Sequence, residues 1–339
     1  MGLVLLAVAL ALGSALRVAN LGALELSPDE AASWAAASAP TAAEVIALQP
    51  HLNPGELPVH DLMLHAWIAL FGSSAAAMRS LSAVFGVASI LLIYIVSCEL
   101  FECANDTNSA LSDDESRMIA GLAALVFAVN LVTIKYSREA RMYPVMLAAI
   151  LAQVAMFLRA LRSGGIANYA VLIVLTALAI ASNFAAVLIP ATEGLWLVYL
   201  IARAGFRPQS AAARRAFAIT IALGAAAFIL MPKVFYALHA ASAGHVGGWR
   251  KLPEWYAPFA LFNKATGSFG FPILAALAIW GMITGWRRGA RDAIAFAMLW
   301  MWAPPLIMLL ASYTIAPVFI ERYALSCFAP FFILVALGI

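Results

Sequence analysis

The chain has 339 residues, of which 65% are hydrophobic and only 11% are charged, and its mean hydropathy is +0.94. A soluble globular domain is about half apolar and about a quarter charged, so this composition excludes an ordinary soluble protein and predicts a polytopic membrane protein. The net charge of +3 is small and dispersed, which excludes nucleic acid as a partner.

Ten long apolar stretches follow one another along the chain. Because a membrane-spanning helix needs about 20 mostly apolar residues, they predict an all-α bundle of about ten transmembrane helices in a single domain, 1–339. The expected spans are 3–22, 79–101, 118–134, 143–161, 167–183, 186–202, 216–235, 269–286, 292–311 and 323–339. The first is interpreted as an uncleaved span rather than a signal peptide, because no basic residue precedes it. The last reaches Ile339 without a polar flank, which leaves open whether the native chain continues.

The orientation follows from Lys and Arg, which gather in short loops on the cytoplasmic side of a membrane. With the N-terminus inside, three inner loops carry Arg159 and Arg162, then Arg203, Arg207, Arg214 and Arg215, then Arg287, Arg288 and Arg291. The outer face then receives the segments 23–78, 135–143, 236–268 and 317–323. These outer segments mix acids, aromatic residues, Gly and Pro, so we expect the functional site there, on the outer face of the membrane.

The first outer segment opens with an acidic pair in the stretch ELSPDEAASW. Asp29 and Glu30 follow Ser-Pro, a pattern typical of a helix start with acids in the first turn. A helix cap is therefore one interpretation of the pair. The other is a general base, since a carboxylate is well suited to take a proton from an acceptor hydroxyl.

Residues 57–72 are apolar but too short to span, so they predict a helix that lies in the membrane interface. The apolar side of this helix is expected to hold Leu62, His65, Ile68 and Ala69. Asp61 is set apart from that side, and Trp67 is expected at the level of the lipid headgroups.

The loop KYSREARMY concentrates positive charge on the outer side, where the orientation rule expects little. It contains Lys135, Arg138, Arg141 and Tyr143. A collar of snorkelling side chains is one interpretation. The alternative is a phosphate site, because the planar fork of arginine matches phosphate oxygens.

The stretch PVFIERY places Glu321 and Arg322 at the mouth of the last span, again on the outer side. Either the two side chains form a local pair or anchor, or Arg322 serves the site. The segment 236–268 predicts either a flexible lid or ordinary interfacial aromatics; its polar and aromatic residues are His239, His245, Trp249, Arg250, Trp255 and Tyr256.

Single residues are open to two interpretations each. Arg17, near the outer end of the first span, either pairs with the site or snorkels to the surface. Glu193 lies within a span, where an acid is a functional candidate or bonds a neighbouring helix. His51, His60 and His65 lack clean metal spacing, so surface histidines are favoured over a zinc site. The three cysteines, Cys98, Cys103 and Cys327, predict neither a disulfide framework nor a zinc motif.

The order of these motifs resembles the GT-C superfamily of integral-membrane glycosyltransferases. The matching stretches are SPDEAASW (27–34), LPVHDLMLHAWIALFGSSAAAMRSLSAVFG (57–86), YSREARMYPV (136–145) and FIERYAL (319–325). The subgroup that they most resemble contains the protein O-mannosyltransferases and the bacterial aminoarabinose transferases, which use lipid-linked sugars.

The resemblance implies a GT-C-like bundle that moves a sugar from a polyprenyl-phosphate donor to a lipid, glycan or protein acceptor, with inversion of the anomeric centre. It implies that Asp29 is the catalytic carboxylate and that Glu30 supports it. Arg141 and Tyr143 would lie near the donor phosphate, and Arg322 would be a second residue on the phosphate side or one that shapes the site.

The residues agree with this chemistry, which needs a base on one side of the anomeric carbon and positive charge on the other. We therefore add Lys135 and Arg138 to the expected phosphate group, and Arg17, His60 and Glu321 to the residues expected to shape the site. A sugar phosphate already has a good leaving group, so no cofactor is required and a divalent metal is not indicated.

The stretch HLNPGELPVHD departs from the usual family pattern, which is richer in aromatic residues and has paired prolines, so the acceptor pocket is expected to differ. Two other functions remain open. One is a transporter or flippase for a lipid or lipid-linked sugar, which favours internal symmetry that this chain does not show. The other is a membrane scaffold, in which Asp29 only caps a helix.

Overall fold

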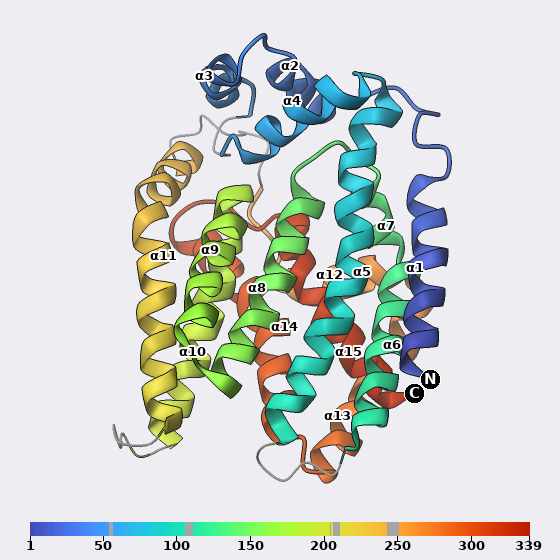
Figure 1. Cartoon of the computed structure of the whole chain (residues 1–339), viewed down its shortest axis with the longest axis vertical. Coiled ribbons are helices and arrows are strands. Elements are labelled where there is room, and N and C mark those ends of the chain that lie inside the picture. The colour runs from blue at the N-terminus through green and yellow to red at the C-terminus, as the bar shows by residue number, and fades with distance from the viewer. Residues whose placement is uncertain (54–56, 106–110, 204, 206–210, 243–250) are drawn as a thin grey trace.

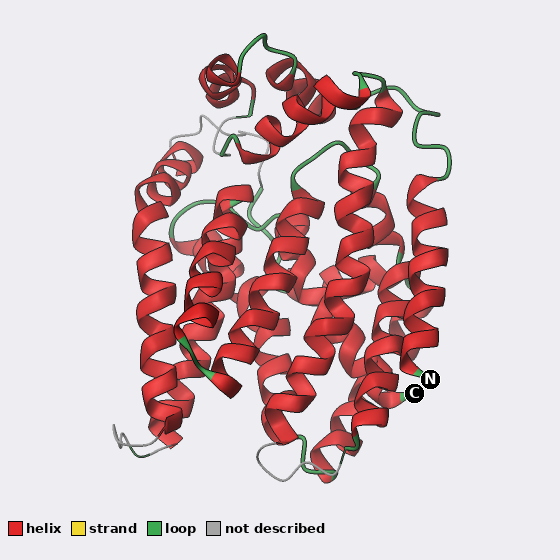
Figure 2. Cartoon of the chain, in the orientation of Figure 1, coloured by secondary structure: helices red, strands yellow, loops and turns green. Residues whose placement is uncertain are grey.

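The computed structural model describes the chain except for residues 54–56, 106–110, 204, 206–210 and 243–250, and it shows a bundle of helices without a strand in the described part (Figures 1 and 2). The helices are α1 (Gly2–Val18), α2 (Pro28–Ala37), α3 (Ala42–Leu52), α4 (Val59–Phe71), α5 (Ala75–Asn105), α6 (Asp113–Val129), α7 (Leu131–Ser137), α8 (Tyr143–Ser163), α9 (Ile166–Ser182), η1 (Phe184–Val187), α10 (Leu188–Arg203), α11 (Ala211–Ser242), α12 (Ala257–Thr266), α13 (Gly270–Arg287), α14 (Arg291–Thr314), η2 (Glu321–Cys327) and α15 (Phe328–Gly338).

The predicted all-α polytopic membrane fold is confirmed. Among the described residues, six helices are long and apolar enough to cross a membrane, or up to eight if each of two bent pairs counts as one span. Two further apolar helices, α1 and α9, have 17 residues each, or about 26 Å at 1.5 Å per residue. Each of the ten predicted ranges overlaps one of these elements.

The predicted span 118–134 is wrong in one respect, because it is not a continuous helix. α6 ends at Val129 and α7 continues from Leu131 at an angle of 63°. Asn130 causes the break: its side-chain oxygen accepts hydrogen bonds from the backbone N–H groups of Val132 (3.0 Å) and Thr133 (3.2 Å), which caps a new helix. α12 and α13 form the second bent pair, at 107°, and Gly267 provides the positive φ of +74° between them.

The buried guanidinium of Arg17 stabilises the break between α6 and α7. Arg17 is 0% exposed. It donates hydrogen bonds to the carbonyl of Ala128 (2.9 Å), at the end of α6, and to the hydroxyls of Thr133 (3.2 Å) and Ser137 (3.2 Å) on α7. A bend leaves helix carbonyls without their usual partners, and a buried polar group needs one. Arg17 is therefore a structural donor here and does not reach the surface as a snorkelling residue does.

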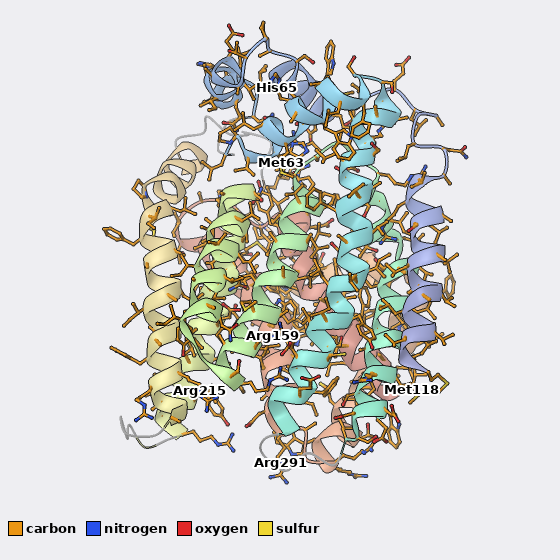
Figure 3. The ribbon with its side chains drawn as sticks, in the orientation of Figure 1. Met63, His65, Met118, Arg159, Arg215 and Arg291 are labelled. Carbon is orange, nitrogen blue, oxygen red and sulfur yellow. The ribbon has the colours of Figure 1, made fainter. Side chains whose placement is uncertain are left out.

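The predicted first outer segment forms a layer of three helices, α2, α3 and α4, across one end of the bundle (Figure 1). The ends of the chain lie toward the opposite end. Figure 3 shows His65 in the layer, and Arg159, Arg215 and Arg291 toward the opposite end. This distribution agrees with the orientation predicted from Lys and Arg in the short loops. The layer is thus separated from the arginine-rich end by the length of the bundle.

The side of α4 that is buried differs from the prediction. His60, Asp61 and Leu64 are the buried residues of this helix, while Ala69 is exposed. Burial of Asp61 is tolerated because its carboxylate accepts a hydrogen bond from Asn53 (3.2 Å) and contacts His60 Nδ1 (3.1 Å). Trp67, expected at the level of the lipid headgroups, donates to the carbonyl of Ala77 and the hydroxyl of Ser80 on α5.

Candidate functional site

Asp29 and Arg322 meet although 293 residues separate them in the chain. Asp29 lies in the first turn of α2, and its side chain is 55% exposed. Arg322, at the start of η2, donates from Nη1 to Asp29 Oδ2 at 3.1 Å. The Arg322 guanidinium also lies 5.3 Å from the ring centroid of Tyr143, which is a cation–π contact. The structure therefore unites three residues that the sequence placed in three separate outer segments.

The helix cap of α2 is made by other residues than Asp29. Ser27 is the N-cap, its hydroxyl accepts from the backbone N–H of Glu30 (3.3 Å), and the Glu30 carboxylate accepts from the N–H of Ser27 (2.9 Å). This is a reciprocal capping box. The exposed carboxylate of Asp29 takes no part in it.

Glu30 is buried and forms an ion pair with Arg79, a residue that the sequence interpretation did not single out. Arg79 Nε and Nη2 donate to the two Glu30 oxygens at 2.7 and 2.9 Å. Arg79 Nη1 also donates to the carbonyls of Leu21 and Leu24, both at 2.8 Å, so it anchors the loop before α2. The sequence does contain an indication of this role, because Arg79 lies in the first turns of a predicted span, in the stretch AMRSLSAVFG.

The surroundings of Glu30 keep it ionised. Burial alone raises the pKa of this carboxyl, but the hydrogen bonds from Arg79 and from the backbone N–H groups of Ala140 and Ser27 outweigh it and lower the pKa to about 2. The bond from Ala140 (2.9 Å) ties the loop between α7 and α8 to α2. Glu30 is thus satisfied on both oxygens and holds the segment that carries Asp29.

Arg141 forms a second tie to α2 and is itself 5% exposed. Its Nη1 donates to the carbonyl oxygen of Asp29 (3.0 Å), to Ser33 Oγ (2.9 Å) and to Asn53 Oδ1 (2.9 Å). Asn53 donates in turn to the buried Asp61. Arg141 therefore links α2 to the end of α3 and, through Asn53, to α4.

The remaining predicted cations have other contacts. Arg138 donates to the carbonyl of Ala19 at 2.6 Å, next to the end of α1, and exposed Lys135 lies 5.3 Å from the ring centroid of Tyr136. Glu321 pairs with Lys264 of α12 at 2.6 Å rather than with Arg322. Of the expected phosphate group, the structure brings Arg141, Tyr143 and Arg322 to Asp29.

Glu139 is a further acid near the site; the sequence places it in the loop KYSREARMY, but no role was assigned to it. Burial raises its pKa; Lys135 and Arg322 lower it, and Glu30 and Asp29 raise it. The net result is a raised pKa, to which burial contributes most. Glu139 lies in the stretch YSREARMYPV, one of the stretches that resemble the GT-C superfamily, and this position is the only sequence feature that pointed to it.

The predicted histidine and lid residues are only partly described. His60 contacts Asp61, and His65 Nδ1 lies 2.9 Å from the carbonyl oxygen of Ala37. Within the described residues no three His, Cys, Asp or Glu side chains form a group that could hold a metal ion. In the segment 236–268, Trp255 and Tyr256 are exposed. His245, Trp249 and Arg250, and the side chain of His239, lie outside the described residues.

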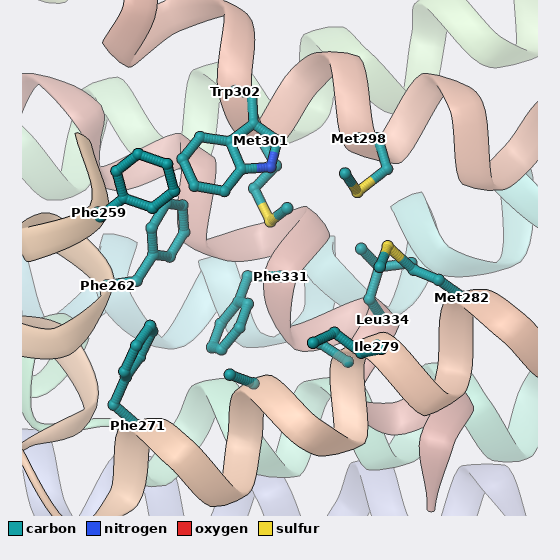
Figure 4. Close-up of a pocket in the computed structure, with 12 residues that line it drawn as sticks. Phe259, Phe262, Phe271, Ile279, Met282, Met298, Met301, Trp302, Phe331 and Leu334 are labelled. Atoms are coloured by element: carbon teal, nitrogen blue, oxygen red, sulfur yellow. The ribbon is translucent and has the colours of Figure 1, made fainter. Parts of the chain in front are cut away.

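An apolar cavity of about 180 Å³ opens between α12, α13, α14 and α15 (Figure 4). It is lined by Phe259, Phe262, Phe271, Ala275, Ala278, Ile279, Met282, Met298, Met301, Trp302, Phe331 and Leu334. α12 connects this cavity with the site, because Phe259 and Phe262 line the cavity while Lys264 pairs with Glu321, the neighbour of Arg322.

Within the bundle, Glu193 of α10 is completely buried and accepts a hydrogen bond from Gln153 of α8 at 2.7 Å. Gln153 Nε2 also lies 3.4 Å from the hydroxyl of Thr176 on α9. Of the two roles left open for this acid, a bond to a neighbouring helix is observed.

No family profile and no curated protein matches the chain. Solved structures of the oligosaccharyltransferase of Archaeoglobus fulgidus are similar in fold. The complex with Zn and sulfate is 14% identical with a TM-score of 0.61, and the match covers 98% of this chain and 48% of that one. The complex with an inhibitory peptide and a dolichol-phosphate is 12% identical with a TM-score of 0.62, covering 99% and 50%.

This chain therefore spans about half the length of the solved structures that it matches. At these identities the likeness concerns the fold. The chain therefore shares the helical membrane fold of that oligosaccharyltransferase, which agrees with the bundle that the sequence motifs implied.

Proposed function

We propose that this protein is a membrane glycosyltransferase that transfers a sugar from a polyprenyl phosphate to a hydroxyl of a lipid, glycan or protein acceptor, on the extracytoplasmic face of an inner membrane. The observation that carries the proposal is the Asp29–Arg322 pair at 3.1 Å, at the end of a GT-C bundle. An exposed carboxylate beside a guanidinium supplies both a base and a positive charge at one place.

In the proposed reaction the acceptor oxygen attacks the anomeric carbon, and Asp29 takes the proton from the acceptor hydroxyl. The bond between the anomeric carbon and the phosphate oxygen breaks on the opposite face, which inverts the centre. The polyprenyl phosphate leaves with the electron pair, and Arg322 stabilises its charge. A guanidinium has five N–H donors. In the proposed reaction the sugar comes between the two side chains, so the ion pair of Arg322 with Asp29 opens and these donors bind the phosphate.

Glu30 and Arg141 act as positioning residues in this proposal. Both are buried and hold α2 in place: Glu30, itself in α2, accepts from Ser27 and from Arg79 of α5, and Arg141 donates to the carbonyl of Asp29. A base must be held within hydrogen-bond reach of the proton that it removes. These contacts fix the backbone of Asp29 while leaving its carboxylate accessible.

The apolar cavity supports a polyprenyl donor over a water-soluble one. A polyprenyl phosphate joins an apolar chain to an anionic head, and α12 joins an aromatic- and methionine-lined cavity to the polar side chains beside Arg322. Ligand cavities lined by apolar side chains next to a few polar groups are typical of such amphipathic ligands. The similar oligosaccharyltransferase of Archaeoglobus fulgidus was solved with a dolichol-phosphate, which supports a lipid of that class as the donor here.

The proposal is tested by incubating the purified protein in lipid nanodiscs with a panel of radiolabelled polyprenyl-phosphate sugars and an extract of membrane lipids and glycans. Labelled product should form with at least one donor. The transporter would be favoured over the transferase if the donor bound without forming product and the protein instead moved it across a proteoliposome membrane.

The sequence assigned three arginines to the phosphate, and Arg141 is a buried positioning residue. Of the other two, Arg322 and Arg138, only Arg322 should matter for the donor. Arg322→Gln should raise the KM for the donor by about 10- to 100-fold, because a hydrogen bond to a charged group is lost. Its ion pair with Asp29 is partly exposed, so little stability should be lost. The measurement is initial rate against donor concentration.

Arg138→Gln is the matched control, since Arg138 donates to the Ala19 carbonyl. Its KM for the donor should stay within about threefold of the wild type. Equal KM values in the two variants would remove Arg322 from the phosphate site.

A further inference from the structure

A basic cavity of about 380 Å³ lies where the C-terminal end of α8 meets the first turns of α9 and α11. Its lining residues are Arg162, Ser163, Gly164, Gly165, Tyr169, Ala211, Arg214 and Arg215. Figure 3 places Arg215 near the end of the bundle away from the helical layer. The cavity is thus remote from Asp29 and Arg322 and takes no part in the proposed reaction.

Among the described residues around this cavity, arginines outnumber carboxylates. Arg162 pairs with Glu99 at 2.9 Å and also with Glu102, and Arg159 pairs with Glu99. Arg214 and Arg215 add two more cations. Four arginines against two glutamates leave a net charge of +2 among the described residues of the cluster.

The basic cavity is built into the fold rather than assembled from loose surface side chains. Arg215 Nη1 donates to the carbonyl oxygens of Leu161 (3.0 Å) and Arg162, which anchors α11 to the end of α8. The loop passes through Gly164 and Gly165 at φ values of +66° and +96°. A Cβ on Gly164 would lie 3.1 Å from the Tyr169 hydroxyl and 3.3 Å from Arg215 Cδ, so the lining is closely packed.

An exposed apolar stripe begins at the cavity and runs along α11. Phe217, Ile221 and Phe228 are 64%, 58% and 80% exposed. They lie 3, 7 and 14 residues after Arg214, a spacing that puts all four on one face of a helix. A cationic cavity therefore continues directly into an apolar surface that faces outward from the bundle.

We infer that this cavity binds the phosphate of an anionic diacyl phospholipid, with an acyl chain lying along Phe217, Ile221 and Phe228. A free phosphate would use the arginines and leave the stripe unused. A zwitterionic lipid would use the stripe but gain less from the net positive charge. Basic pockets between membrane helices on the cytoplasmic side are suited to anionic headgroups, and the arginine rule predicts that this end is cytoplasmic.

The lipid site is tested by native mass spectrometry of the full chain, titrated with phosphatidylglycerol or phosphatidylcholine in detergent. The wild type should retain one phosphatidylglycerol. Arg214→Gln combined with Arg215→Gln should weaken this binding by about 30-fold. The control is Arg287→Gln combined with Arg291→Gln, which removes two exposed arginines of α13 and α14 and should leave the bound lipid in place.

Two further arms keep the inference falsifiable if the double variant does not fold. Arg214 is exposed, so Arg214→Gln alone should fold and should bind phosphatidylglycerol more weakly than the wild type. Phe217→Ser should also weaken the binding of phosphatidylglycerol, without changing the number of charges. Inorganic phosphate at millimolar concentration should not displace the lipid. Any of three outcomes would overturn the assignment of an anionic phospholipid site. They are equal retention of phosphatidylcholine, unchanged lipid binding in Arg214→Gln, and displacement of the lipid by phosphate together with no effect of Phe217→Ser.

Discussion

Asp29→Asn should lower the rate of sugar transfer by about 10²- to 10⁴-fold, the range that a positioned general base contributes. Asparagine preserves the size of the side chain and cannot take the acceptor proton. The helix cap of α2 is made by Ser27 and Glu30, and Asp29 is more than half exposed, so the variant should remain folded. The measurement is product formation under saturating donor, with thermal melting of both proteins alongside.

Glu25→Gln is the matched control for Asp29→Asn, because Glu25 is an exposed acid of the same loop. It should retain wild-type turnover. Full activity in a folded Asp29→Asn protein would show that Asp29 is not the general base. If Glu139→Gln were then inactive, the base would be Glu139, the second acid within reach of Arg322.

Glu30→Gln should destabilise the protein by about 3–5 kcal/mol, the usual cost of removing one partner of a buried ion pair. The loss leaves the Arg79 guanidinium, 8% exposed, without its carboxylate. Glutamine can still complete a capping box, so the helix start itself should survive. Chemical or thermal unfolding in nanodiscs measures the change.

The control for Glu30→Gln is Glu44→Gln at the start of α3. Glu44 occupies the same capping-box position relative to Thr41, but its hydrogen bonds are exposed to solvent. The same substitution there should cost less than about 1 kcal/mol. Equal losses at both positions would show that the capping box, and not the pair with Arg79, accounts for the effect of Glu30.

The lowered pKa of Glu30 also predicts a pH dependence. Because its folded pKa is about 2 against an ordinary value of 4.5, the unfolded chain binds the proton more readily. The contribution of Glu30 to stability is therefore complete above pH 4.5 and is lost as the pH falls toward 2. Wild-type melting should decline across this window, and Glu30→Gln should lack that part of the decline.

The sequence by itself determined the helices and the end of the molecule that carries the candidate site. Spanning helices depend on runs of apolar residues, which are local, and every predicted range overlaps a helix or, in 118–134, a bent pair of helices. The capping box at Ser27 is likewise local. Because each span reverses the direction of the chain, the order of spans was enough to predict that Asp29, Tyr143 and Arg322 lie at one end.

Only the tertiary structure decided which member of each motif is accessible and which is buried. Asp29 and Glu30 are neighbours with similar chemistry, yet the fold turns one toward solvent and pairs the other with Arg79, 49 residues away. Arg17 likewise donates a hydrogen bond to Ser137, which is 120 residues away in the chain. The pairing of a side chain depends on contacts between distant segments, and residue type and spacing do not encode those contacts locally.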